Sequence, residues 1–155
     1  MPEPVEPSRA PAGVLGAPVP MQVVIVHTDD LAVSLSGFAA QPAGAEMALT
    51  VRSAGDDSPV GDAQALGMEI GFADGRVAGT VGTLAREHRT SATVELVGRY
   101  DAPGRTDLRF WLSPLPPRGR LTVTLAWPER DIAPTRVVVD GGPLVEAANR
   151  AQVLW

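Results

Sequence analysis

A chain of 155 residues with 45% hydrophobic and 20% charged residues has the composition of an ordinary globular domain that can bury a core of its own. It contains no cysteine, which excludes disulfides, thiolate metal sites and cysteine nucleophiles. Its formal net charge is −5 and its arginines form no basic stripe, which argues against binding to nucleic acid or to an anionic membrane surface.

The first twelve residues differ from the rest of the chain. Residues 1–12 hold four prolines and few apolar side chains, which predicts an extended arm ahead of a single domain over residues 13–155. We see no charged stretch followed by an apolar one at the start, and no apolar run of about 18 residues that would span a membrane. We therefore expect a cytoplasmic protein, in keeping with the absence of disulfides.

The first part of the domain shows the patterns of successive strands. Residues 14–20 predict a short edge strand, because proline donates no hydrogen bond to a neighbouring strand. Residues 21–28 are apolar on both faces and predict a central strand. Alternation over residues 31–37 predicts a third strand, and its phase breaks at Phe38, which indicates a bulge at Gly37.

Further strands follow, and one turn is marked clearly. Residues 46–53 alternate, and we expect the core to receive Met47, Leu49 and Val51. The pair Asp74–Gly75 between extended runs predicts a hairpin with a two-residue type I′ turn. That register places Phe72 opposite Val77.

The second half continues the same alternation. Strands are expected over residues 92–98, 108–112, 121–127 and 135–139. The side chains expected to face the core are Val94, Leu96, Leu108, Phe110, Leu112, Leu121, Val123, Leu125 and Trp127. The strands are short and no helical pattern lies between them, which argues against a parallel α/β fold.

The C-terminal residues change pattern. Pro143 suits the first turn of a helix, and good helix formers follow it, so we predict a terminal helix over residues 143–154. Its expected apolar face consists of Leu144, Ala148, Ala151 and Trp155. The fold class expected from the whole chain is all-β: a two-sheet antiparallel β-sandwich, immunoglobulin-like or related, with one C-terminal α-helix.

Several segments also carry a family resemblance. They are Gly71–Arg76 (GFADGR), Phe110–Pro117 (FWLSPLPP), Trp127–Pro128 and the tail from Thr135 to Trp155. With these segments in this order, residues 21–155 resemble a group of uncharacterised actinobacterial β-sandwich proteins of unknown function. The resemblance implies the fold and no particular activity.

Catalytic and cofactor motifs are missing from the sequence. It has no GxSxG, Walker or GxGxxG pattern, and His27 and His88 are isolated. We therefore name no catalytic residue and no cofactor, and expect a protein that is not an enzyme. Low-ranking calcium candidates are the loop aspartates, for which the alternative is an ordinary role in turns: Asp29, Asp30, Asp56, Asp57 and Asp62.

One aromatic residue stands out as a candidate interface residue. If Phe110 faces the core, Trp111 faces away from it, on the same face as Arg109 two residues before. An exposed tryptophan beside an arginine is typical of a protein-binding hot spot. We favour the other interpretation, in which Trp111 is covered by the terminal helix or lies in the second layer of the sandwich, and a side chain exposed close to 0% would exclude the interface.

These observations favour a non-enzymatic protein-interaction or structural module. Its expected partner is a protein or a second copy of the chain, and not nucleic acid or membrane. One alternative is a sandwich that binds calcium or a small ligand through its aspartate-rich loops. A second alternative is a hydrolase that uses a pair of acidic residues.

Overall fold

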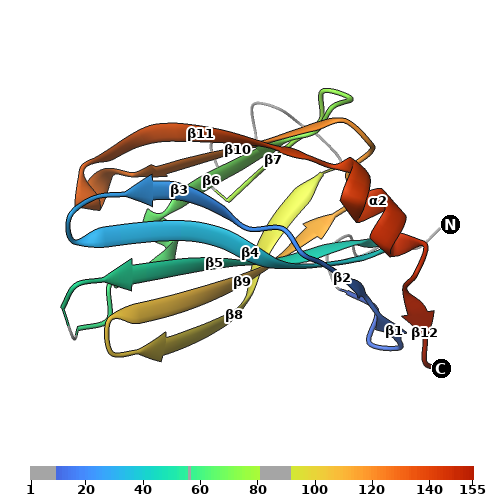
Figure 1. Cartoon of the computed structure of the whole chain (residues 1–155), viewed down its shortest axis with the longest axis horizontal. Helices are drawn as coiled ribbons and strands as arrows, with labels where there is room; N and C mark the ends of the chain where they lie inside the picture. The colour runs from blue at the N-terminus through green and yellow to red at the C-terminus, as the bar shows by residue number, and fades with distance from the viewer. Residues whose placement is uncertain (1–9, 56, 81–91) are drawn as a thin grey trace, which may run out of the picture.

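The computed structural model describes residues 10–55, 57–80 and 92–155; most of the predicted arm lies outside this range. The described chain is built mainly from strands in antiparallel sheets, with one short α-helix (Figure 1). This confirms the all-β prediction.

The largest sheet has six strands in the order β2-β4-β5-β9-β8, and β3 pairs with β4 beside β2. Its strands are β2 (Ala17–Val19), β3 (Val23–His27), β4 (Leu31–Gln41), β5 (Gly44–Ser53), β8 (Thr93–Ala102) and β9 (Arg105–Ser113). The prediction that residues 21–28 form a central strand is wrong, because among the described strands β3 pairs with β4 alone, and Val24 is 54% exposed. Val23 and Val26 pack at the rim of the core, which explains an apolar strand at an edge.

The second sheet has four strands in the order β11-β10-β6-β7. Its strands are β6 (Gly67–Gly71), β7 (Val77–Gly79), β10 (Arg120–Trp127) and β11 (Ile132–Asp140), with the 3₁₀ helices η1 (Ala63–Ala65) and η2 (Pro128–Arg130) before β6 and after β10. The two sheets lie face to face (Figure 1).

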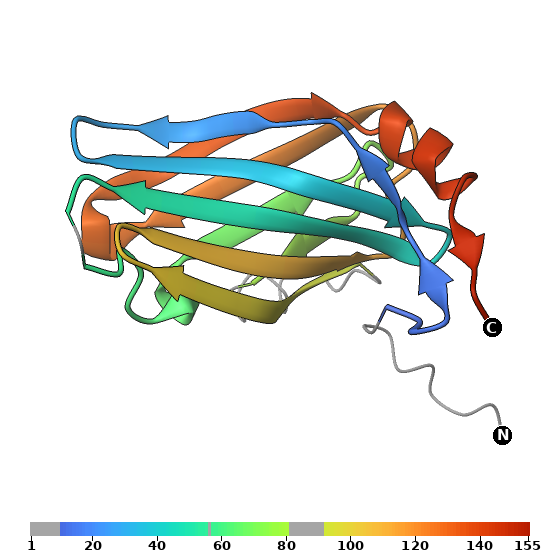
Figure 2. The same cartoon turned by 60° about the horizontal axis from the view of Figure 1, so that its bottom comes forward.

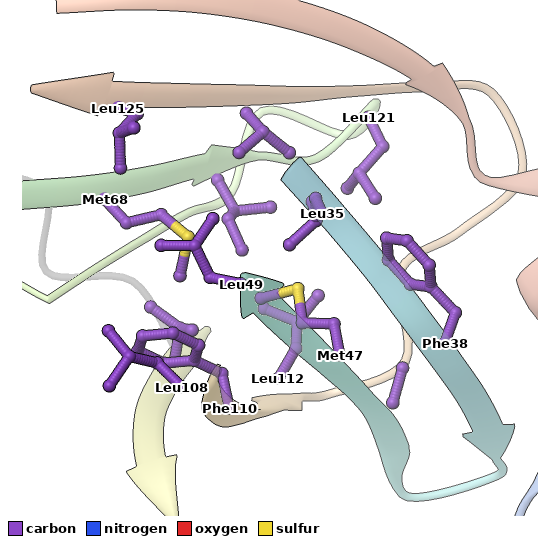
Figure 3. Close-up of a cluster of buried hydrophobic side chains, with 14 of the residues drawn as sticks. Leu35, Phe38, Met47, Leu49, Met68, Leu108, Phe110, Leu112, Leu121 and Leu125 are labelled. Atoms are coloured by element: carbon purple, nitrogen blue, oxygen red, sulfur yellow. The ribbon is translucent and has the colours of Figure 1, made fainter. Parts of the chain in front are cut away.

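The hydrophobic core fills the space between these sheets. Leu49 and Leu108 from the six-stranded sheet point toward Met68 and Leu125 from the four-stranded sheet, and all four are buried (Figure 3). Every second residue of these strands faces inward, as the alternation predicts. Burial of these side chains from both layers is the main force that holds the sheets together.

A glycine makes the long strand β4 change phase. The pairing of β4 with β5 shifts between Ser36 and Ala39, and Gly37 has φ +64°, a conformation that other residues rarely adopt. The shift turns Phe38 into the core, where it is 3% exposed. The predicted bulge is therefore confirmed.

The hairpin at Asp74–Gly75 is present, but its predicted register is wrong. Val77 pairs with Gly71, and the Phe72 N–H donates to the Arg76 carbonyl at 2.8 Å. Gly75 has φ +92°, whereas Asp74 does not have a positive φ. This is a three-residue loop with one left-handed glycine in place of the type I′ turn. The Asp74 carboxylate accepts hydrogen bonds from the Arg76 backbone and side chain, which favours the longer loop.

The β8–β9 hairpin is longer than predicted and moves one side chain out of the core. Both strands continue to a tight turn at Gly104, which has φ +71°. The pairing shifts between Leu96 and Gly98, so a bulge interrupts the alternation there. Leu96, expected in the core, is 44% exposed.

The predicted terminal helix is half as long as expected. Helix α2 spans Gly142–Ala148, and β12 (Gln152–Val153) follows it and pairs with β1 (Val14–Leu15) in a two-stranded sheet. The helical periodicity fails after Ala148 because pairing with β1 outweighs the helix propensity of the last residues. Leu144 is fully buried as predicted, whereas Trp155 is 85% exposed.

Candidate functional site

The molecule has two ends that differ in character (Figure 1). At the loop end, the β3–β4 turn, residues 57–66 and the β8–β9 turn come together. At the terminal end lie α2 and the sheet of β1 and β12.

The loop aspartates in the described part of the chain do not all meet at one site. Asp29 and Asp30 lie in the exposed β3–β4 turn, and Asp62 caps η1 by accepting a hydrogen bond from the Gln64 N–H. Asp56 lies outside the described residues. Within the described ranges, no three His, Cys, Asp or Glu side chains lie close enough to hold a metal ion.

One pocket does bring two predicted aspartates together. Asp30 and Asp57 line a shallow pocket of about 220 Å³, which Arg130 lines as well. The Arg130 guanidinium donates to the Pro59 carbonyl at 2.6 Å and covers the Trp127 ring. A fixed positive charge in the pocket opposes a divalent cation, so the geometry does not favour calcium here.

A hydrogen-bonded group of four side chains closes the loop end. The Asp101 carboxylate accepts hydrogen bonds from the Ser58 and Thr106 hydroxyls, each at 2.7 Å, and from the Arg99 guanidinium at 2.7 Å. Arg99 also donates to the carbonyls of Val60 and Gly61. We call Ser58, Arg99, Asp101 and Thr106 the loop-end network. It ties the segment after β5 to the β8–β9 hairpin.

The electrostatics of this network oppose catalysis. Hydrogen bonds from Arg99, Ser58 and Thr106 hold the pKa of Asp101 well below its usual range. A carboxylate with such a low pKa is a weak base and does not activate the Ser58 hydroxyl as a nucleophile. The chemistry of the network therefore suits a structural role, in which its hydrogen bonds hold the loops together.

The neighbouring Asp107 is arranged in a similar way. Burial raises its pKa, but the Thr50 hydroxyl at 2.7 Å and the Arg105 guanidinium at 3.1 Å outweigh burial and lower the pKa overall. Glycoside hydrolysis needs one carboxyl group that stays protonated near neutral pH. Neither Asp101 nor Asp107 meets that requirement, so this acidic pair does not support a hydrolase.

Arg109 and Trp111 do not form the predicted exposed pair. Arg109 is exposed and pairs with Glu46 at 3.0 Å, but Trp111 is 1% exposed. The Trp111 ring lies on Gly44, where an added Cβ would approach the ring to 2.7 Å. The burial of Trp111 agrees with the favoured interpretation that the domain covers this side chain, and it excludes Trp111 as a solvent-facing interface residue.

The terminal end carries the exposed apolar residues that sequence reasoning missed. Val14 pairs with Val153, Leu15 pairs with Gln152, and the Leu154 N–H donates to the Gly13 carbonyl at 2.7 Å. We call residues 13–15 and 152–155 the terminal ribbon (Figure 2). Its exposed large apolar side chains are Leu15 (55%), Val153 (78%), Leu154 (49%) and Trp155 (85%).

Both faces of the terminal ribbon are apolar. Because side chains alternate along a strand, Val14, Val153 and Trp155 share one face, and Leu15 shares the other with Leu154. The prediction of a helix over these residues hid this pattern. The terminal ribbon could have been predicted from the alternation of side chains over Gln152–Trp155 and from the apolar residues 14–15, which can form its partner strand.

Comparisons with known proteins do not identify this chain. No protein-family model, no curated protein and no solved structure matches it. In the part of the chain that the structure describes, no helix is long and apolar enough to cross a membrane.

Proposed function

We propose that this chain is a non-enzymatic protein-binding module on an immunoglobulin-like β-sandwich, and that its terminal ribbon binds a second copy of the chain. The observation that carries the proposal is the exposure of Leu15, Val153, Leu154 and Trp155 on a ribbon of only two strands. The absence of cysteines suits a cytoplasmic location, which we propose as well.

Energetics favour a covered ribbon over a free one. An isolated pair of strands is at best marginally stable in water, and further strands or packing on an apolar face stabilise it. Burial of apolar surface contributes about 25 cal/mol per Å². Residues such as Val153 and Trp155 therefore stabilise an assembly more than they stabilise the free chain.

Charge and symmetry favour a second copy as the partner. The terminal ribbon contains no charged side chain, so two copies, each with a formal charge of −5, can approach there without placing charged side chains of like sign in contact. Two-fold symmetry is the commonest symmetry of protein dimers, and it places the same surface of each copy in contact with that of the other. Two ribbons paired in this way would also satisfy backbone groups at the edges of β1 and β12.

Sedimentation velocity over a range of protein concentrations tests the proposal. The test variant is Val153→Ser and the control is Val138→Ser, a valine on β11 that is 52% exposed and lies outside the ribbon. We expect the wild type and Val138→Ser to dimerise with rising concentration and Val153→Ser to remain monomeric. A wild type that stays monomeric throughout, or two variants that dimerise equally well, would overturn the proposal.

A further inference from the structure

A second surface, separate from the terminal ribbon, lies along strand β8. This strand is at the end of the six-stranded sheet and pairs with β9 on one side. In the described part of the chain, no strand pairs with its other side. Every second residue of such an edge strand points its N–H and C=O groups outward, where another strand can pair with them.

Only the first half of this edge is open. From Arg99 onward the segment after β5 covers it, because the Arg99 guanidinium donates to the carbonyls of Val60 and Gly61 at 2.5 and 2.7 Å. The bulge at Val97 separates this covered half from the start of the strand. The open edge is therefore the stretch from Thr93 to Leu96.

A cleft with both apolar and polar lining residues runs beside the open edge. It has a volume of about 570 Å³ and is lined by Ala63, Gln64, Leu66, Thr80, Val94, Glu95, Leu96 and Phe110. Val94, Leu66 and Phe110 are buried at its base, whereas Leu96 is 44% exposed at its mouth. Volumes of roughly 300–1,000 Å³ are typical of sites that hold a ligand.

Thr93 and Glu95 each carry a polar group that has no partner among the described residues. Glu95 is exposed and makes no ion pair with the described residues. The Thr93 hydroxyl oxygen is buried and has no hydrogen-bond partner. Residues two apart on a strand share a face, and of these two residues the exposed Glu95 is within reach of a long side chain from a neighbouring strand.

We propose that the open edge of β8 binds an extended peptide that adds to the six-stranded sheet as a further antiparallel strand. The peptide has an arginine or lysine opposite Glu95. The residues on either side of this cation are apolar and point into the cleft. The ligand class is therefore a segment with the pattern apolar-basic-apolar, bound mainly through backbone hydrogen bonds.

Fluorescence anisotropy with two labelled peptides tests this site. The probe is Ser-Thr-Val-Arg-Val-Thr-Ser, and the comparison peptide has glutamate in place of arginine. The test variant is Glu95→Lys, with Glu129→Lys as a control for net charge, since Glu129 lies in η2. We expect Glu95→Lys to bind the arginine peptide about tenfold more weakly than the wild type and to prefer the glutamate peptide, while Glu129→Lys binds as the wild type does.

Hydrogen exchange of the whole chain locates the bound peptide. Saturation with the arginine peptide should slow exchange of amides within residues 93–97 in both the wild type and Val153→Ser, since the site does not involve the terminal ribbon. Failure of the wild type to bind the arginine peptide would overturn the proposal. Equal weakening by Glu95→Lys and Glu129→Lys, or binding without protection of these amides, would overturn it as well.

Discussion

The two ends of the molecule differ in how far their side chains are paired or covered. At the loop end, the charges of Arg99 and Asp101 are paired with each other and with hydroxyl and carbonyl groups. At the terminal end, Val153 and Trp155 are 78% and 85% exposed although both are apolar. Satisfied polar contacts therefore stabilise the fold at the loop end, whereas uncovered apolar surface at the terminal end is available to a partner.

The largest effect is expected at the buried part of the terminal end. Leu144 is fully buried where α2 packs on β2 and β4, so Leu144→Ala should lower the free energy of unfolding by about 2–5 kcal/mol. Urea denaturation measures this change, with Val153→Ala as the control in the ribbon. An unchanged free energy of unfolding in Leu144→Ala would contradict this difference between the ends, because α2 would then not contribute to the core.

The next effect is expected in the loop-end network. Thr106 is fully buried and its hydroxyl donates to Asp101, so Thr106→Val should lower the free energy of unfolding by about 1–3 kcal/mol. The matched control is Thr135→Val on β11, whose hydroxyl bonds only to the exposed Ala133 carbonyl. Equal stabilities of the two variants would show that the network does not lock the loop end.

A pH dependence should follow from the same network. The pKa of Asp101 is lowered in the folded protein by Arg99, Ser58 and Thr106, so its stabilising contribution is complete above the unfolded value of about 3.9. That contribution is lost as the pH falls from this value through the folded pKa. Asp101→Asn should therefore be less stable than the wild type at neutral pH and show a flatter decline of stability below about pH 4.

Asp57→Asn serves as the control for this pH dependence. Asp57 is exposed and has no hydrogen bond or ion pair to the described residues, so its variant should follow the wild type. Thermal unfolding measured at a series of acidic pH values compares the three proteins. Parallel curves for Asp101→Asn and the wild type would contradict a depressed pKa.

The smallest effect on stability is expected in the terminal ribbon. Trp155→Ala should change the free energy of unfolding of the monomer by no more than about 0.5 kcal/mol, because the side chain is 85% exposed. Dilute protein at a concentration below that of dimerisation provides the measurement. A large loss of stability would show that Trp155 holds the fold together instead of remaining available to a partner.

Sequence patterns predicted the features that depend on local alternation. The inward faces of β5 and β10 and the bulge at Gly37 follow from the period of two and from one glycine. These features are local, because burial of one strand face requires only neighbouring residues in the sequence to alternate.

The features that depend on distant residues were not predicted. The end of α2 at Ala148 results from the pairing of β12 with β1, more than 130 positions earlier in the chain. The loop-end network joins Ser58 to Asp101, and the only local signal for it is the spacing of Arg99 and Asp101 on one strand face.

A concentration series of NMR spectra of the ¹⁵N-labelled chain tests whether the terminal ribbon forms the proposed dimer. The proposed dimer predicts that rising concentration shifts the amide signals of residues 13–15 and 152–155, while those of Ser58, Asp101 and Thr106 stay in place. In Val153→Ser the ribbon signals should not move. Signals that do not depend on concentration, or shifts that gather at the loop end, would contradict the assignment of the terminal ribbon as the binding surface.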